Sequence, residues 1–328
     1  MSRALEVENL RVTFPGANGT RFAAVDGVSF GLSRGETLAL VGESGCGKSL
    51  TSLSLLRLVP PPGRIEPESR IHLGETDVLS LRGEALRDIR GRRIGMIFQD
   101  PMTSLDPVFR VGDQIAEGIL AHFPVSKREA RERAVGLLRE VGIPDPASRA
   151  QAYPHQLSGG MRQRVMIAIA LAAEPEILVA DEPTTALDVT VQAQILEVLD
   201  RLRTQRGMAV LLITHDLGIV AGRADRVLVM YAGEIVEEAP TPRLFAQPSH
   251  PYTQGLFASF PRLSGPVERL NPIPGTVPTA AAWPSGCRFR PRCPYAFEPC
   301  VRDPTLLPAG PEHRARCWLI EEGVRRER

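Results

Sequence analysis

The stretch TLALVGESGCGKS, residues 37–49, joins a short apolar strand to a glycine-rich turn, and a helix is expected from Lys48 to about Leu58. Gly42–Ser49 fits the pattern G-x-x-x-x-G-K-[ST], whose glycines let backbone N–H groups turn around phosphates. In this pattern Lys48 reaches the β- and γ-phosphates, and the Ser49 hydroxyl binds Mg²⁺. A glycine-rich structural turn is the alternative, and the strand–turn–helix context argues against it. The stretch therefore predicts that a nucleoside triphosphate binds.

Alternating strands and helices around this stretch predict an α/β fold with a mostly parallel sheet. The segment 84–165 is mostly helical, with charged faces such as that of 127–140. From about residue 240, prolines become dense and strand-forming runs vanish, which predicts a boundary there. The other expected elements are strands at 3–14, 25–32, 177–180 and 209–214, a helix at 191–205, and a hairpin of 227–231 and 234–237 that turns at Ala232-Gly233.

The composition excludes several classes of protein. The chain of 328 residues has 39 basic and 38 acidic side chains, a balance that argues against a protein built to coat nucleic acid or an anionic bilayer. The first residues lack an apolar run of signal-peptide length, and the chain has no uninterrupted apolar stretch of about 18 residues. We therefore expect no membrane span, and a role in transport would need other subunits to supply the pore.

Two acids follow four apolar residues in ILVADE at 177–182. A buried parallel strand would carry these acids to the carboxyl edge of the sheet, where the glycine-rich turn is also expected. There Asp181 would hold Mg²⁺, and Glu182 would polarise the water that attacks the γ-phosphate. Many strands end in acids, so the value of this pattern depends on the motifs around it.

A third motif, LSGGM at 157–161, lies between the glycine-rich turn and the acidic strand end. Ser158, Gly159 and Gly160 precede a helix, and a helix N-terminus of this kind binds anions. An ordinary helix cap is the alternative for a lone SGG. The order of the three motifs resembles that of the ATP-binding-cassette (ABC) ATPases, and LSGGMRQRVMIAIALAAEP is similar to the signature region of that family.

The resemblance implies roles for further residues. Gln99, in FQDP at 98–101, matches the Q-loop of the family, and Ala186-Leu187-Asp188 matches its D-loop. His215, at the end of LLITHD, matches the switch histidine, which contacts the γ-phosphate. Phe14 is the expected adenine-stacking aromatic residue and Phe22 is its rival, although either ring could instead belong to the core.

The implied fold is a P-loop NTPase cassette with a mostly parallel sheet core, an antiparallel β edge and a helical subdomain at about 99–165, all within an ATP-binding domain at 1–240. In this family the signature loop of one domain faces the phosphate loop of another, so two domains would sandwich two ATP molecules. The implied catalytic residues are Glu182, His215 and Gln99. The implied Mg²⁺ ligands are Ser49, Gln99 and Asp181. The residues expected at the nucleotide are Phe14, Gly42, Ser44, Gly45, Cys46, Gly47, Lys48, Ser49, Leu50, Gln99, Asp181, Ser158, Gly159, Gly160 and Asp188.

The segment 241–328 indicates which branch of the ABC ATPases the chain resembles. It contains HPYT at 250–253, followed by proline-rich, cysteine-bearing sequence, which resembles the C-terminal extension of oligopeptide/dipeptide importer ATPases. GESGCGKS, FQDPMTSLDP and ADEPTTALDVTVQAQIL are similar to that subfamily as well. The resemblance implies uptake of di- or oligopeptides driven by ATP hydrolysis. Nickel, glutathione or another small solute are the alternative substrates.

The implied partners are a second ABC ATPase subunit in a heterodimer, two transmembrane permease subunits and an extracytoplasmic solute-binding protein, and no nucleic acid. The chain would lie on the cytoplasmic face of the cell (inner) membrane, attached through the permease subunits. A soluble ABC ATPase of translation or DNA repair is a remote alternative, because such chains usually carry two cassettes or a long insertion. A regulatory subunit with a dead site is a third, and the complete set of motifs argues against it.

Four of the five cysteines lie in the last 42 residues, with gaps of five, six and sixteen residues between them: Cys287, Cys293, Cys300 and Cys317. In an intracellular chain, four clustered thiols indicate a metal before a disulfide. Structural zinc sites usually contain close C-x₂₋₄-C pairs, which are absent here, and wide loops suit an iron–sulfur cluster at least as well. The resemblance implies a structural [4Fe–4S] cluster, with zinc or unliganded thiols as alternatives. Cys46, inside the glycine-rich turn, is not an expected ligand.

Overall fold

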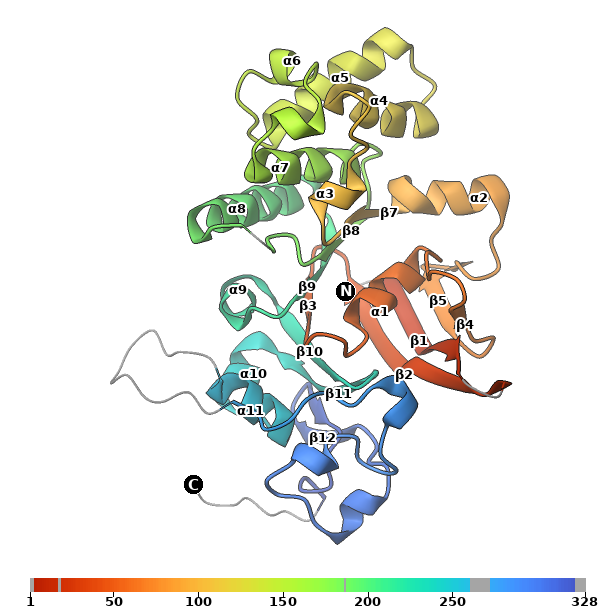
Figure 1. The fold of residues 1–328 in the computed structure, drawn as a ribbon, viewed down its shortest axis with the longest axis vertical. Helices are drawn as coiled ribbons and strands as arrows, with labels where there is room; N and C mark the ends of the chain where they lie inside the picture. Colours follow the sequence, from red (N-terminus) through yellow and green to blue (C-terminus); the bar gives the residue numbers. More distant parts are fainter. Residues whose placement is uncertain (1–2, 17–18, 186, 260–271, 322–328) are drawn as a thin grey trace. The chain divides into compact units, whose positions relative to one another are not determined.

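The computed structural model describes residues 3–16, 19–185, 187–259 and 272–321, and the chain separates into two compact units (Figure 1). Unit 1 comprises the described residues of Met1–Leu5, Leu32–Glu36 and Leu73–Ile213. Unit 2 comprises the described residues of Glu6–Gly31, Thr37–His72 and Thr214–Arg328. None of the helices in the described part of the chain is long and apolar enough to cross a membrane.

A parallel sheet forms the core of unit 1. Its middle strand is β8 (Ile177–Asp181), with β7 (Ile94–Ile97) on one side and β9 (Ala209–Thr214) on the other. Every residue of the three strands is buried, which is typical of parallel strands covered on both faces. The carboxyl end of β8 therefore delivers Asp181 to the edge of this sheet.

Helices make up most of the rest of unit 1 and pack against one another (Figure 1). α5 (Lys127–Glu140) shows why they form: Ser126 caps it by accepting a hydrogen bond from the Glu129 N–H. Its buried residues recur at helical spacing, while its charged residues face solvent. The other helical segments are α2 (Gly83–Asp88), η2 (Ile89–Arg93), α3 (Pro101–Ser104), α4 (Val111–His122), α6 (Pro146–Arg149), η3 (Pro154–Gln156), α7 (Gly159–Ala170) and α8 (Val189–Arg206), and β6 is Thr76–Asp77.

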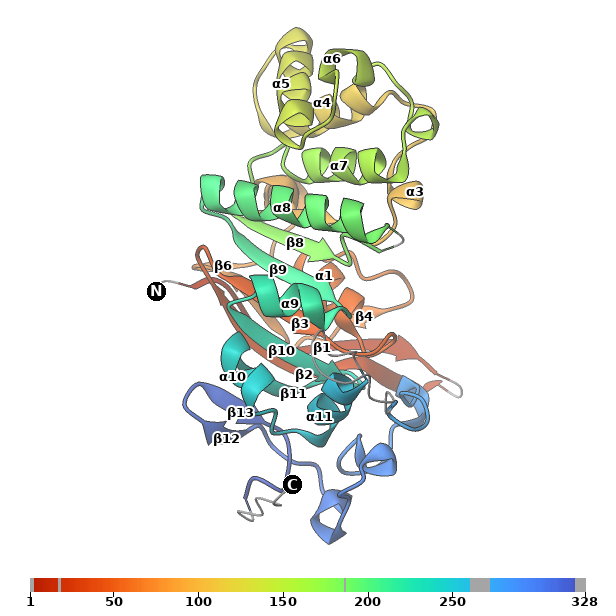
Figure 2. The same ribbon diagram turned by 90° about the vertical axis from the view of Figure 1, so that its left-hand side faces the viewer.

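One sheet of unit 2 is built from both ends of that unit. β3 (Thr37–Val41) runs parallel to β10 (Arg226–Tyr231), which forms an antiparallel hairpin with β11 (Glu234–Pro240). β13 (His313–Ala315) pairs with β11, and β12 (Leu307–Gly310) pairs with β13 (Figure 2). The C-terminal segment thus adds two strands to the sheet that carries the glycine-rich turn.

A second sheet and several short helices complete unit 2. β1 (Arg3–Pro15) is antiparallel to β4 (Arg64–Ile65) and β5 (Arg70–Leu73), and β2 (Arg21–Ser33) lies beside β1. The helical segments are α1 (Lys48–Leu55), α9 (Leu217–Arg223), α10 (Thr241–Ala246), α11 (Pro251–Ala258), η4 (Ala280–Ala282), η5 (Arg290–Arg292) and η6 (Glu298–Val301).

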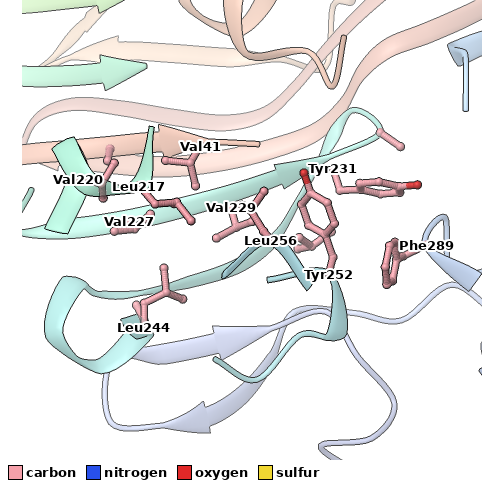
Figure 3. Packing of buried hydrophobic residues seen from close by; sticks show 14 residues of the cluster. Val41, Leu217, Val220, Val227, Val229, Tyr231, Leu244, Tyr252, Leu256 and Phe289 are labelled. Atoms are coloured by element: carbon pink, nitrogen blue, oxygen red, sulfur yellow. The ribbon is translucent and has the colours of Figure 1, made fainter. Parts of the chain in front are cut away.

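A single hydrophobic cluster joins the strands of unit 2 to its C-terminal segment. Tyr231 at the end of β10, Tyr252 of α11 and Phe289 converge from three separate segments (Figure 3). The Tyr231 and Tyr252 ring centroids are 4.7 Å apart, and Phe289 meets both rings edge-on at 5.3 and 5.5 Å. Val41 and Val229 belong to the same cluster, so this core extends across residue 240.

Most of the strands and helices predicted from the sequence occur within a few residues of their expected bounds. The segment 84–165 is mostly helical, as expected, and it also contains the buried strand β7, whose four apolar residues lack the alternation that would reveal a strand. Two other expectations were wrong. The C-terminal segment does contain strands, β12 and β13, because pairing with β11 stabilises runs too short to be recognised. The first helix ends at Leu55 rather than near Leu58.

Candidate ATP-binding site

The glycine-rich turn follows a path that two glycines make possible. Gly42 has φ 154°, and a Cβ there would lie 2.2 Å from the Met230 carbonyl oxygen. Gly47, just before α1, has φ 110°, and its Cβ would lie 2.9 Å from the Ala24 carbonyl oxygen. A side chain at either position would force the backbone to move. These contacts explain why the motif has glycine at its first and last glycine positions.

Lys48 is held against the turn from which it projects. Its side chain is buried, and its Nζ donates to the carbonyl oxygens of Gly42 at 2.8 Å and Glu43 at 3.0 Å. Cys46 is fully buried 3.8 Å from the same Nζ, and burial raises the pKa of its thiol. The thiol is therefore neutral at physiological pH, and the lysine is the only cation in the turn itself.

The other predicted contact residues of unit 2 lie on its surface. Ser44 and Gly45 are exposed, and His215 is exposed directly after β9. The Phe14 and Phe22 rings stack on each other with centroids 6.2 Å apart and an interplanar angle of 22°. Both aromatic candidates for the adenine thus form one partly exposed pair, and their geometry favours neither over the other. Ser49 and Leu50 are partly exposed in the first turn of α1.

The acidic strand end organises a small polar site within unit 1. Asp181 is buried at the end of β8, and Glu182 follows with φ 46°, a region that side chains rarely adopt. The Glu182 carboxylate accepts hydrogen bonds from Gln99 Nε2 at 3.2 Å and from Thr185 Oγ1 at 2.8 Å. Gln99 and Glu182 were both predicted from the sequence. Thr185 was not predicted, and the feature that could have indicated it is a hydroxyl side chain three residues after Glu182.

The signature motif and the D-loop lie beside each other in unit 1. Ser158 caps α7 by accepting a hydrogen bond from the Met161 N–H at 3.4 Å, and Asp188 caps α8 through the Val191 N–H at 2.9 Å. A Cβ at Gly160 would lie 2.6 Å from Val191 Cγ1, so this glycine allows the starts of the two helices to approach closely. Ala186, the first residue of the predicted D-loop, lies outside the described residues.

Comparisons with known proteins agree with this set of motifs. Residues 25–185 match the family model of the ABC transporters, and residues 236–300 match that of the C-terminal region of oligopeptide/dipeptide transporters. The oligopeptide transport ATP-binding protein AppD of Bacillus subtilis (strain 168) is 51% identical to the chain, over 98% of each. The dipeptide transport ATP-binding protein DppD of the same organism is 50% identical, over 98% of this chain and 96% of its own length.

The chain belongs to the ABC transporter ATPases. A solved dimer of the ATP-binding cassette MJ0796 with ADP and Pi has the same cassette fold, with a TM-score of 0.64 and 28% identity over 72% of this chain and 98% of its own. The predicted fold class, the predicted family and the ATPase activity are therefore confirmed.

Two side chains of the C-terminal segment of this ABC ATPase contact its phosphate loop, and sequence reasoning missed both contacts. The Tyr252 hydroxyl accepts a hydrogen bond from the Glu43 N–H at 2.8 Å. Arg292 forms a bidentate pair with the Glu43 carboxylate, with N–O distances of 2.6 and 3.0 Å. The sequence offered one hint for each residue: Tyr252 belongs to the HPYT motif, and Arg292 lies directly before Cys293. Neither hint indicates a contact with the phosphate loop.

The four C-terminal cysteines of the ATPase line one cavity, together with aromatic residues that include Phe289 and Trp318. Burial raises the pKa of the Cys287 thiol to about 11 and that of Cys317 to about 12, and the neighbouring thiols add to both shifts. Among the residues that the structure describes, no group of three or more His, Cys, Asp or Glu side chains is arranged to hold a metal ion.

Proposed function

We propose that this ATPase energises the uptake of di- or oligopeptides through partner permease subunits. The observation that carries this proposal is identity of about half over the full length of ATPases of oligopeptide and dipeptide transport, including their C-terminal region. A match confined to the cassette would support any ABC transporter. The match to the extension favours the peptide branch over nickel, glutathione or another small solute.

The proposed partners follow from the same relationship. We propose a second ABC ATPase subunit in a heterodimer, two transmembrane permease subunits and an extracytoplasmic solute-binding protein, with the chain on the cytoplasmic face of the membrane. One copy of each motif per chain supports the pairing. We assign residues 1–240 to the ATP-binding domain, with its helical subdomain at about 99–165, and 241–328 to the extension.

Within the ATP site we propose distinct roles for the residues. Lys48 would neutralise charge on the β- and γ-phosphates, while Ser49, Gln99 and Asp181 would hold Mg²⁺, whose charge supports transfer to water. Glu182 would orient the attacking water, a role that its hydrogen bonds to Gln99 and Thr185 support by fixing the carboxylate. The remaining contacts proposed for the nucleotide are those of Phe14, Gly42, Ser44, Gly45, Cys46, Gly47, Leu50, Asp188 and His215 and those of Ser158, Gly159 and Gly160 from the paired subunit.

We also propose that the four C-terminal cysteines hold a [4Fe–4S] cluster of structural role. The chemistry of the donors supports the proposal, because all four thiols line one apolar cavity and thiolates are the ligands such clusters prefer. A zinc ion would need the four sulfurs within about 2.3 Å of a single point, a more compact arrangement than a cluster requires. Zinc remains the alternative. Burial raises the pKa of the Cys287 and Cys317 thiols, so a bound cation would be needed to favour their thiolate forms at neutral pH.

Reconstitution tests the transport proposal. The chain, purified with its membrane partners and the solute-binding protein, would be placed in liposomes and supplied with labelled dipeptides, oligopeptides, nickel or glutathione. We expect ATP-dependent peptide uptake, and no uptake in a matched complex that carries Lys48→Ala. Uptake of nickel or glutathione in place of peptides would contradict the peptide assignment, and uptake that persists in the Lys48→Ala complex would contradict the role of this ATPase.

Anaerobic purification tests the cluster proposal. We expect a brown protein with about four iron and four sulfide per chain. Cys300→Ser should lower both contents, whereas Cys46→Ala should leave them unchanged because Cys46 lies outside the cavity. One zinc per chain would favour the alternative, and a colourless protein that contains neither metal would refute both.

A further inference from the structure

Glu43, the second residue of the phosphate loop, is held by three groups. Its backbone N–H donates to the Tyr252 hydroxyl at 2.8 Å, and its carboxylate forms the bidentate pair with Arg292. Its carbonyl oxygen accepts from Lys48 Nζ at 3.0 Å. The lysine expected at the phosphates and two residues of the C-terminal extension therefore act on the same residue from different sides.

Both extension residues are themselves fixed in place. The Tyr252 side chain is fully buried, and its ring packs on those of Tyr231 and Phe289 (Figure 3). Arg292 is nearly buried, and its Nε donates to the Pro274 carbonyl oxygen at 2.8 Å. Its guanidinium also contacts the Gly275 carbonyl oxygen at 3.3 Å and the Tyr231 hydroxyl at 3.4 Å. Groups held this firmly can impose a position on the loop, since their own side-chain freedom is already lost.

The charge of Glu43 gives the arginine a second effect. A carboxylate within a loop that receives a polyanionic triphosphate repels that ligand, and the Arg292 guanidinium compensates the carboxylate at close range. Loss of the arginine would leave this negative charge in the loop. Loss of both partners would leave neither charge, so their effects on ATP binding should be strongly non-additive.

We infer that Tyr252 and Arg292 are positioning residues of the phosphate loop, which makes the C-terminal extension part of the ATP site. The inference rests on the proposed role of Gly42–Ser49 at the triphosphate. Tyr252 sets the path of the Glu43 peptide, and Arg292 sets the orientation and net charge of its side chain. Neither residue needs to touch the nucleotide, because both act through Glu43 and the carbonyl oxygens that Lys48 contacts.

The test compares variants of the full-length chain purified with its membrane partners, measuring the Kd for ATP, the KM and kcat of hydrolysis, and the Tm without nucleotide. Arg292→Met should raise the Kd and KM by about tenfold, with a smaller change in kcat. Glu43→Gln in the same chain should restore most of the lost affinity. Tyr252→Phe keeps the ring and should raise the KM by roughly threefold to tenfold. Arg290→Met is the matched control, because Arg290 lies in the same short helical segment as Arg292 but is partly exposed.

The outcomes separate this inference from the proposed function. An Arg292→Met variant with wild-type KM and Kd and only a lower Tm would overturn it, as would a double variant that binds ATP no better than Arg292→Met alone. If Arg292→Met fails to fold, a wild-type KM in both Tyr252→Phe and Arg292→Gln would overturn it instead. A Lys48→Ala variant that binds ATP like the wild type would point to a failure of the proposed loop function itself.

Discussion

Replacing Phe289 with alanine should destabilise the strands that carry the phosphate loop, although Phe289 lies far beyond the cassette motifs in sequence. Its side chain is 2% exposed and contacts Tyr231 and Tyr252 edge-on. Truncation of a buried phenylalanine to alanine costs about 3–5 kcal/mol in the free energy of unfolding. Because Val41 of β3 belongs to the same cluster, that cost should extend to the strand preceding the loop.

Hydrogen exchange measured by mass spectrometry can locate the loss. Amides of β3, β10 and α11 that open together with the core should exchange roughly 10²–10⁴-fold faster in Phe289→Ala, which is the same free energy expressed as a ratio. Phe109→Ala is the matched control, since Phe109 is 56% exposed and its truncation should change little. Faster exchange confined to the extension, with β3 and β10 as well protected as in the wild type, would show that the reasoning is wrong.

Three further outcomes are expected. Glu182→Gln should lower turnover by about 10²–10⁴-fold while ATP-bound dimers accumulate, as measured by phosphate release and size-exclusion chromatography; full turnover would refute the assignment. Gly42→Ala should abolish ATP binding in a nucleotide titration, because its Cβ would lie 2.2 Å from the Met230 carbonyl oxygen, whereas Gly45→Ala, with no atom within 4 Å of its Cβ, should retain more binding. Burial raises the pKa of Glu234 to about 7, although Arg288 and Arg316 oppose this shift. The folded protein therefore binds a proton at Glu234 more tightly than the unfolded chain does. The resulting stability is fully present below about pH 4.5 and is lost as the pH rises to about 7. Denaturant unfolding across this range should show Glu234→Gln gaining up to about 3 kcal/mol relative to the wild type, and parallel pH profiles for the two proteins would contradict the raised pKa.

Local patterns account for what the sequence could predict of the fold. The strand Thr37–Val41 has the bounds expected, because an apolar run before a glycine-rich turn specifies its structure within a few residues. The charged stretch 127–140 lies on a helix, in agreement with the mostly helical segment expected there, because its buried residues recur at helical spacing. β7 was not predicted, because a buried parallel strand of four apolar residues has no hydrophobic periodicity that distinguishes it from a helix. β13 was not predicted, because this strand forms by pairing with β11, which lies far away in the sequence.

The same distinction applies to the site. Gln99 and Glu182 could be chosen from motifs, and the structure brings them within hydrogen-bonding distance although 83 residues separate them. The pair of Arg292 and Glu43 spans 249 residues and links two segments whose motifs give no sign of each other. No spacing rule connects such residues, because they meet through tertiary contacts such as the packing of Tyr231 and Tyr252 on Phe289.

The shared core of unit 2 has a consequence for recombining subunits of this kind. An extension transplanted from another ATPase would bring its own counterparts of Tyr252, Phe289 and Arg292 against a foreign Tyr231 and Glu43. A cassette cut at residue 240 would lose β13, one of the two strands that pair with β11, and expose the remainder of the aromatic cluster to water. The segment that carries the phosphate loop and the C-terminal extension should therefore be exchanged together as one unit, even though residues 50–240 lie between them in the sequence.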